Sequence, residues 1–264
     1  MPGEQFKEGF VEADGFRVRY LEAGSGKTLV CIHGGGGLRL SHAHDLFAAK
    51  HHVVAFEMPG FGSSPENTRS ETTADLARCM NEAISRLGIE RYSLMGTSFG
   101  SKVALWMAIE KPDPVEAIVL MSPAAIRERE GPVPTRVSPQ EAARLMYAHP
   151  ERHRGTPPPP ALVAKHAALT SRLLGPPRDP PFESRLRELK QEVLVLFGTE
   201  DKVVPAEGAY LFREALENCH IMFVYDAAHA IDADRPEALE SVVTDFLHRK
   251  EQFIVREQSD LIHN

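Results

Sequence analysis

The sequence predicts an α/β protein, with a mostly parallel sheet flanked by helices and one inserted helical segment. Short, nearly continuous apolar runs alternate with helical patterns from about residue 17 to 123, and the alternation resumes after 190. Such apolar runs are typical of strands that are buried on both faces of a parallel sheet. Residues 124–190 break this rhythm and hold 12 of the chain's 20 prolines. We therefore expect an interrupted α/β core.

Eight strands are expected. The first two form an antiparallel pair turned at Asp14-Gly15. The others are the apolar runs at 28–33, 52–57, 91–96, 116–121, 192–198 and 220–226.

Helical patterns separate the strands. Residues 72–88 form one, with Thr72 or Thr73 as the N-cap and Gly88 just beyond the end. Another begins at Pro205 and covers 205–217. The last helix is expected to have Asp234 as its N-cap and Pro236 in its first turn. Its inward-facing residues should be Leu239, Val243 and Phe246.

We predict that residues 1–123 and 191–264 form the core and that 124–190 form an inserted helical cap, called the cap segment below. Its helical pieces lie near 138–148, 161–174 and 182–190, and the proline run 157–160 suits a stiff spacer. The cap segment is basic, with 12 Lys and Arg against 7 Asp and Glu. This charge favours either an anionic substrate or a solvated helix surface.

The composition of the chain disfavours several kinds of binding partner. The net charge of −7 argues against general nucleic-acid binding. The N-terminus lacks a signal-peptide pattern, and no apolar run is long enough to span a membrane. Three widely spaced cysteines imply no disulfide framework, and His42 and His44 match no zinc signature. We expect a cytoplasmic protein with a small-molecule substrate and no metal or other cofactor. A homo-oligomer stays open, as does packing of the apolar tail 253–264.

Ser98 stands in a G-x-S-x-G motif, Gly96-Thr97-Ser98-Phe99-Gly100, where an expected strand meets an expected helix. In a nucleophile elbow, this sharp turn exposes the serine hydroxyl, and the glycines two residues away relieve crowding. The alternative is a small residue in a tight turn.

A serine needs a base, and the base needs an orienting acid. His229 follows the last expected strand, at the sheet edge where α/β proteins bind ligands. The other histidines, His166 among them, are interpreted as surface or packing residues. Asp201 follows the preceding strand, with Glu200 as its competitor. The order serine, acid, histidine is the one expected for this kind of triad.

A glycine run, Gly34 to Gly37, follows the strand 28–33. Its backbone N–H groups could approach an oxyanion closely. A phosphate loop would need a Lys-Ser/Thr pair, which is absent. Dinucleotide binding stays open because Glu57 lies at about the required distance along the chain.

Taken together, "LVCIHGGGG", "FEMPGFGSS", "MGTSFGS", "LFGTEDKVVP" and "AAHAIDADRPE" resemble the motifs of the α/β-hydrolase superfamily over nearly the whole chain. The resemblance implies that Ser98 is the nucleophile, His229 the base and Asp201 its orienting acid. It also implies an oxyanion hole formed by the amides of Phe99 and Gly35, with Gly36 as the alternative to Gly35.

Serine at position 98 disfavours the haloalkane dehalogenases and epoxide hydrolases of this superfamily, which use aspartate. The glycine loop and inserted cap are similar to those of carbon–carbon hydrolases of ring-cleavage products. Ala230 and Thr97 depart from that group, which tends to have an aromatic residue and Asn at these positions, and Glu57 replaces the usual Asp. We expect a serine hydrolase of a small ester, thioester or related carbonyl substrate, working through an acyl-enzyme or a gem-diol. The alternatives are a carbon–carbon hydrolase of dienol acids, an acyltransferase or perhydrolase, and a low-turnover receptor.

Overall fold

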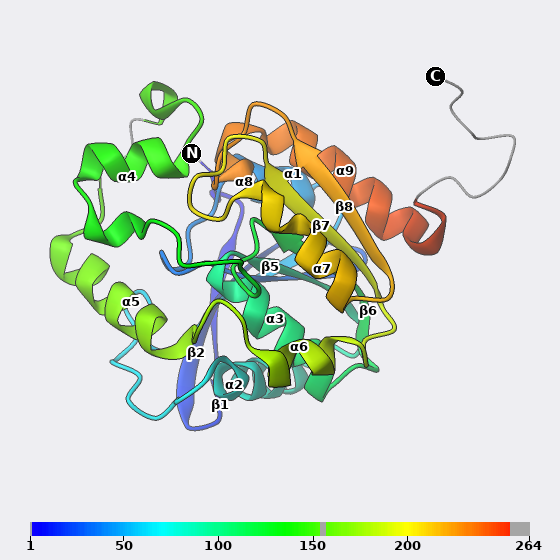
Figure 1. Ribbon diagram of the computed structural model, residues 1–264. Helices are drawn as coiled ribbons and strands as arrows, with labels where there is room; N and C mark the ends of the chain where they lie inside the picture. The colour runs from blue at the N-terminus through cyan, green and yellow to red at the C-terminus, as the bar shows by residue number, and fades with distance from the viewer. Residues whose placement is uncertain (1, 154–156, 254–264) are drawn as a thin grey trace, which may run out of the picture.

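A computed structural model describes residues 2–153 and 157–253 of the chain (Figure 1). Over these residues, eight strands form one sheet in the order β1-β2-β4-β3-β5-β6-β7-β8. The strands are β1 (Lys7–Ala13), β2 (Phe16–Ala23), β3 (Thr28–Ile32), β4 (His52–Glu57), β5 (Tyr92–Thr97), β6 (Val115–Met121), β7 (Glu192–Gly198) and β8 (Cys219–Val224). The tail beyond Phe253 lies outside the described residues, so its expected packing stays untested.

The strand pairing confirms the predicted sheet. β1 and β2 pair antiparallel across Asp14 and Gly15, which both have positive φ, and β2 also pairs antiparallel with β4. All remaining neighbours are parallel. Each expected strand is present within about two residues of its predicted ends, since apolar runs mark buried strands well but not their last residue.

Helices cover both faces of the sheet. They are α1 (His42–Ala48), α2 (Thr73–Arg86), α3 (Phe99–Glu110), α4 (Pro139–Met146), α5 (Pro160–Leu173), α6 (Pro180–Leu186), α7 (Ala209–Ala215), α8 (Ile231–Asp234) and α9 (Pro236–Arg249). Alternate residues of β6 show the two layers. Ile118 and Leu120 belong to the core cluster that includes α2 and α3, whereas Val119 and Met121 belong to the cluster with α1 and α9. Both faces of this central strand are therefore buried under helices.

The helix starts were predicted with mixed success. Thr72 is the N-cap of α2, where its hydroxyl accepts the Asp75 N–H. The predicted N-cap role of Asp234 is wrong, because Arg235 precedes the first residue of α9, Pro236. Asp234 instead ends α8, and its carboxylate accepts the N–H groups of Ala148 and Ala228, each at 2.9 Å. Burial explains the difference, since these two amides would otherwise lack an acceptor.

In the cap segment, α4 and α5 lie beside the body of the molecule at the left of Figure 1. α6 packs on the core helix α3, where the rings of Phe182 and Trp106 lie 5.2 Å apart. Buried Lys102 of α3 connects the two regions, because its ammonium donates to the Asp179 carboxylate at 2.9 Å and the Leu174 carbonyl at 3.0 Å.

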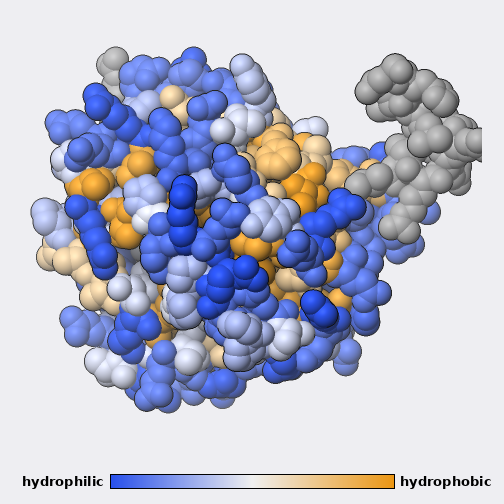
Figure 2. Space-filling view, in the orientation of Figure 1, coloured by the Kyte–Doolittle hydropathy of each residue, from blue (hydrophilic) through white to orange (hydrophobic). Residues whose placement is uncertain are grey.

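The surface in the same orientation is mostly hydrophilic, with patches of hydrophobic residues between the polar ones (Figure 2). On the edge strand β8 and just after it, Phe223 and Tyr225 are exposed. None of the described helices is both long and apolar enough to cross a membrane.

Candidate active site

Ser98 lies at the sharp turn between β5 and α3, with φ 49° and ψ −115°. This backbone conformation is rarely adopted by residues other than glycine, so the packing around it must hold it in place. A Cβ at Gly100 would lie 2.3 Å from the His33 carbonyl oxygen, and one at Gly96 would lie 2.7 Å from the Ala104 side chain. The crowding that the two glycines relieve thus comes from β3 and α3.

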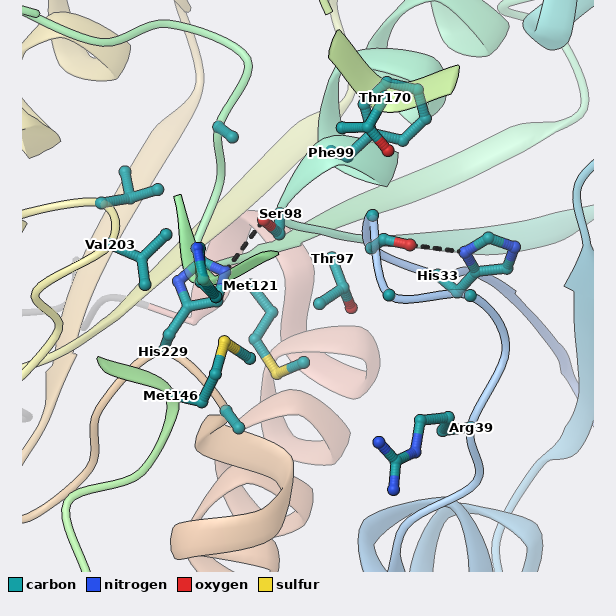
Figure 3. Close-up of a pocket in the computed structure, with 18 of the residues that line it drawn as sticks. His33, Arg39, Thr97, Ser98, Phe99, Met121, Met146, Thr170, Val203 and His229 are labelled. Atoms are coloured by element: carbon teal, nitrogen blue, oxygen red, sulfur yellow. Dashed lines mark hydrogen bonds between the residues drawn. The ribbon is translucent and has the colours of Figure 1, made fainter. Parts of the chain in front are cut away.

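The three residues of the predicted triad come together in one hydrogen-bonded chain. Figure 3 shows the bond between His229 and Ser98. His229 Nε2 lies 2.9 Å from Ser98 Oγ, and His229 Nδ1 lies 2.9 Å from Asp201 Oδ2. A carboxylate only accepts, so Nδ1 carries the proton and Nε2 accepts the Ser98 hydroxyl proton. This arrangement suits transfer of the serine proton to the imidazole.

The buried Asp201 carboxylate is held from its other side. Its Oδ1 accepts the N–H groups of Val203 and Val204 at 2.8 and 2.9 Å. Glu200, the competing acid, is exposed to solvent. The geometry therefore distinguishes two neighbouring acids that the sequence left open.

The glycine loop, residues 34–37, passes beside the serine. A Cβ at Gly34 would lie 3.3 Å from the Ser98 Cβ. Among the described residues, neither the Gly35 nor the Phe99 amide has a hydrogen-bond acceptor. Gly36 is more exposed, and a Cβ there would meet nothing within 4 Å. The Gly36 amide likewise has no acceptor among the described residues, so the oxyanion hole of Phe99 with Gly35 or Gly36 stays a prediction.

Two histidines hold the glycine loop in place. His33 Nδ1 donates to the Gly34 carbonyl at 2.7 Å, while its Nε2 accepts the Met58 N–H at 3.1 Å. His166 of α5 repeats the pattern, donating to the Gly36 carbonyl at 3.2 Å and accepting the Gly62 N–H at 2.9 Å. Both rings must be neutral to accept from a backbone amide.

The electrostatics agree with two neutral rings. Burial lowers the pKa of His33 to about 4. Burial also lowers the pKa of His166 from its ordinary value. Hence both histidines stay uncharged near neutral pH.

Glu57 serves the neighbouring turn. Its buried carboxylate accepts from Ser64 Oγ and Arg19, each at 3.2 Å. It does not line the cavity beside the glycine loop, where a ribose would need it in the dinucleotide interpretation.

A cavity of about 1100 Å³ opens above Ser98 and His229. Its lining combines the ends of β3, β5 and β6 with residues of the cap segment, and Figure 3 shows Met121, Met146 and Val203 around His229. Arg39 lies on the other side, and no acidic partner is found for it among the described residues. The site is largely apolar, with a few polar groups.

Two residues of α5 near the site were missed by the sequence reasoning. It interpreted His166 as a surface or packing residue, but His166 is buried and binds the glycine loop. Thr170, one turn further along α5, lines the cavity. Their spacing of four residues marks one helix face, but nothing in it identifies what that face contacts.

No group of three or more His, Cys, Asp or Glu side chains within residues 2–153 and 157–253 is arranged to hold a metal ion. His44 instead accepts the Ser41 backbone N–H at 3.1 Å.

The family model described as alpha/beta hydrolase fold matches residues 27–180. The chain belongs to the alpha/beta hydrolase fold family. A second model, described as TAP-like protein, matches residues 170–252. This enzyme is accordingly a hydrolase.

Relatives of the hydrolase cover nearly its whole length. It is 27% identical to the 2-hydroxy-6-oxo-6-(2'-aminophenyl)hexa-2,4-dienoic acid hydrolase of Metapseudomonas resinovorans, over 93% of this chain and 92% of that protein. It is 25% identical to the 2-hydroxy-6-oxo-6-phenylhexa-2,4-dienoate hydrolase of Comamonas testosteroni, over 89% and 92%. A solved structure of a membrane phospholipase A has a TM-score of 0.78 at 24% identity, over 92% of this chain and 86% of that one, and shows the shared fold.

Proposed function

We propose that this hydrolase cleaves a carbon–carbon bond next to the ketone of a ring-cleavage dienol acid, with Ser98, His229 and Asp201 as its catalytic residues. The observation that carries the proposal is the hydrogen-bonded chain of these three side chains beneath a large, mainly apolar cavity. The chain matches two relatives that are named as dienoate hydrolases, over nearly their whole length. This similarity supports a dienoate over a simple ester as the substrate.

The residues act in a defined order. His229 Nε2 takes the proton from Ser98 or from a water that Ser98 positions, and the oxygen adds to the substrate carbonyl. The Gly35 and Phe99 amides receive the oxyanion that forms. Asp201 keeps the proton on Nδ1 and stabilises the imidazolium. His229 then returns its proton to the leaving group.

A carbon leaving group needs somewhere to place its electron pair. The dienol must first become a ketone: its hydroxyl loses a proton, and the carbon next to the carbonyl that is attacked gains one. When the carbon–carbon bond breaks, the electron pair enters the conjugated 2-oxo acid as an enolate. One water is consumed, and the products are a carboxylic acid and a shorter hydroxydienoate.

The cavity suits such a substrate. Its volume accommodates a substrate with an aryl or alkyl substituent. Arg39 supplies a positive charge for the substrate carboxylate, because no acidic side chain among the described residues forms an ion pair with it. We also propose that the cap segment, 124–190, covers a core made of 1–123 and 191–264.

Ester hydrolysis is the second candidate, and two residues favour it. Thr97 and Ala230 both line the cavity. The resembling carbon–carbon hydrolases tend to have Asn and an aromatic residue at these positions. The triad and oxyanion hole would serve an ester equally well, through an acyl-enzyme.

The test compares both substrates on one preparation. We expect the protein to consume 2-hydroxy-6-oxo-6-phenylhexa-2,4-dienoate at least about 100 times faster, in kcat/KM, than p-nitrophenyl butyrate. Ser98→Ala should lower the rate by about 10³-fold or more. A fluorophosphonate should add mass at Ser98 in the parent and not in the variant.

Each contrary result has a distinct meaning. Faster ester than dienoate hydrolysis would favour the second candidate. Labelling without turnover of either substrate would favour a receptor. Unchanged activity in Ser98→Ala would exclude Ser98 as the nucleophile.

A further inference from the structure

Thr170 of α5 has a hydroxyl with no partner. Its Oγ1 is buried and makes no hydrogen bond with any described residue. Of the five buried side-chain polar atoms in this condition within residues 2–153 and 157–253, Thr170 Oγ1 alone belongs to a residue that lines the cavity above Ser98. A buried hydroxyl without a partner destabilises the folded protein, so its retention needs a reason.

The helix itself does not use this hydroxyl. Threonine in a helix often donates to the carbonyl four residues earlier, which here belongs to His166. No such bond forms, because Oγ1 lacks any partner among the described residues. The donor of this hydroxyl is therefore not used by any described part of the protein.

The hydroxyl lies over the glycine loop. A Cβ at Gly35 would be 3.1 Å from Thr170 Oγ1 and 3.2 Å from Thr170 Cγ2. Backbone geometry places the amide nitrogen about 2.5 Å from that Cβ position, so Oγ1 lies less than about 6 Å from the Gly35 nitrogen. One oxygen atom can therefore lie within hydrogen-bond distance of both donors.

We propose that Thr170 is a substrate-binding residue whose hydroxyl donates to the carbonyl oxygen attacked by Ser98, together with the Gly35 and Phe99 amides. The inference rests on the proposed function, since it requires attack on a carbonyl or an equivalent centre. The donor comes from the cap segment, so the oxyanion site is complete only while α5 lies over the glycine loop.

Thr170→Val and Thr170→Ser separate the hydroxyl from the shape of the side chain. Valine keeps the volume and removes the donor, and we expect kcat to fall by about 10- to 100-fold with little change in KM, because the bond strengthens as charge develops. Serine keeps the donor and should stay within about threefold of the parent. Thr170→Val should also melt at the same or a higher temperature, since the unpaired hydroxyl is gone.

The second readout needs no substrate. A fluorophosphonate forms a bond from Ser98 Oγ to phosphorus, fluoride leaves, and the serine proton passes to His229. The phosphoryl oxygen then occupies the oxyanion site, so Thr170→Val should slow labelling by a similar factor. Equal labelling and turnover in the parent and Thr170→Val would overturn this inference alone. A parent protein that neither labels nor hydrolyses would overturn the proposed function and this inference with it. Activity lost equally in Thr170→Ser, or lost with a lower melting temperature in Thr170→Val, would assign Thr170 a purely structural role.

Discussion

His33 links the chemistry of a single ring to the geometry of the site. Its Nε2 must be unprotonated to accept the Met58 N–H, and its Nδ1–H fixes the carbonyl of Gly34, the residue before the proposed donor Gly35. Burial lowers the pKa of the ring to about 4, well below the ordinary value of 6.5. Protonation of His33 would therefore destabilise the folded protein and break the hydrogen bond from Met58.

The consequence is a measurable pH dependence of stability. Between about pH 6.5 and pH 4 the unfolded chain binds a proton at His33 and the native protein does not, so the free energy of unfolding falls as pH falls. The lowered pKa corresponds to about 3 kcal/mol over this window. His33→Asn keeps a donor for Gly34 but has no titrating ring, so it should be less stable near pH 7 and approach the parent near pH 4. Urea unfolding between pH 4 and pH 7 measures this difference. The same pH dependence of the free energy of unfolding in both proteins would show that His33 does not titrate as proposed.

At the scale of elements, the strand–turn–helix unit around Ser98 depends on a close backbone-to-backbone contact, which only a residue without a Cβ allows. Gly100, in the first turn of α3, lies against the end of β3, where any Cβ would meet the His33 carbonyl at 2.3 Å. The close approach of α3 to β3 keeps the glycine loop beside the serine. Backbone atoms cannot yield as a flexible side chain can, so the contact is intolerant of added volume.

Gly100→Ala should therefore destabilise the protein by about 3 kcal/mol, whereas Gly208→Ala serves as the control. Gly208 precedes α7 with φ −70°, and a Cβ there would meet nothing within 4 Å. Alanine at 208 should leave stability unchanged or raise it by about 0.5 kcal/mol. Urea midpoints measure both effects. Equal midpoints for Gly100→Ala and the parent would show that β3 and α3 can separate without cost.

The sequence predicted the elements well where local patterns decide them. Apolar runs located six strands, the Asp14-Gly15 turn located the first pair, and Thr72 was recognised as a possible N-cap from its position before an amphipathic pattern. The prediction that Asp234 is an N-cap was wrong because two functions compete for its side chain. Its carboxylate could cap α9, but it binds the amides of Ala148 and Ala228, and Ala148 comes from a segment 86 residues away. Long-range demand of this kind leaves no local pattern.

At the scale of the whole molecule, the cap segment is attached to the core through its basic residues. Arg172 of α5 donates to the backbone carbonyls of Asn67 and Ser70, and Lys165 donates to those of Gly62 and Ser64. The basic residues of the cap segment were expected either to bind an anionic substrate or to form a solvated surface. Arg172 and Lys165 do neither, because they bind backbone carbonyls of the core. They bind α5 to the loop between β4 and α2.

Arg172→Met should loosen this attachment while Arg187→Met should not. Arg187 is exposed in the same segment, and its side chain makes no hydrogen bond or ion pair within the described residues. We expect Arg172→Met to raise KM about three- to tenfold and to lower stability by about 1 kcal/mol, with kcat within about threefold. Steady-state kinetics and urea unfolding measure these effects. Indistinguishable kinetics for the two variants would show that the Arg172 contacts do not position α5.

The triad could be predicted from the sequence, and the cap contacts could not. Ser98, Asp201 and His229 each follow a buried strand, so the sheet brings them to one edge. His166 and Thr170 reach the glycine loop from a helix about 130 residues further along the chain. Their helical spacing is visible in the sequence, but the docking angle of α5 depends on contacts distributed over the entire protein.

The two hydrogen bonds of His166 connect the position of α5 to the conformation of the glycine loop. The same helix that roofs the cavity also steadies the Gly36 carbonyl and the Gly62 amide beneath it. Any displacement of α5 wide enough to admit a bulky molecule must break these bonds and release the backbone that they immobilise. The geometry of the glycine loop therefore depends on the position of α5, a helix that lies about 130 residues further along the chain.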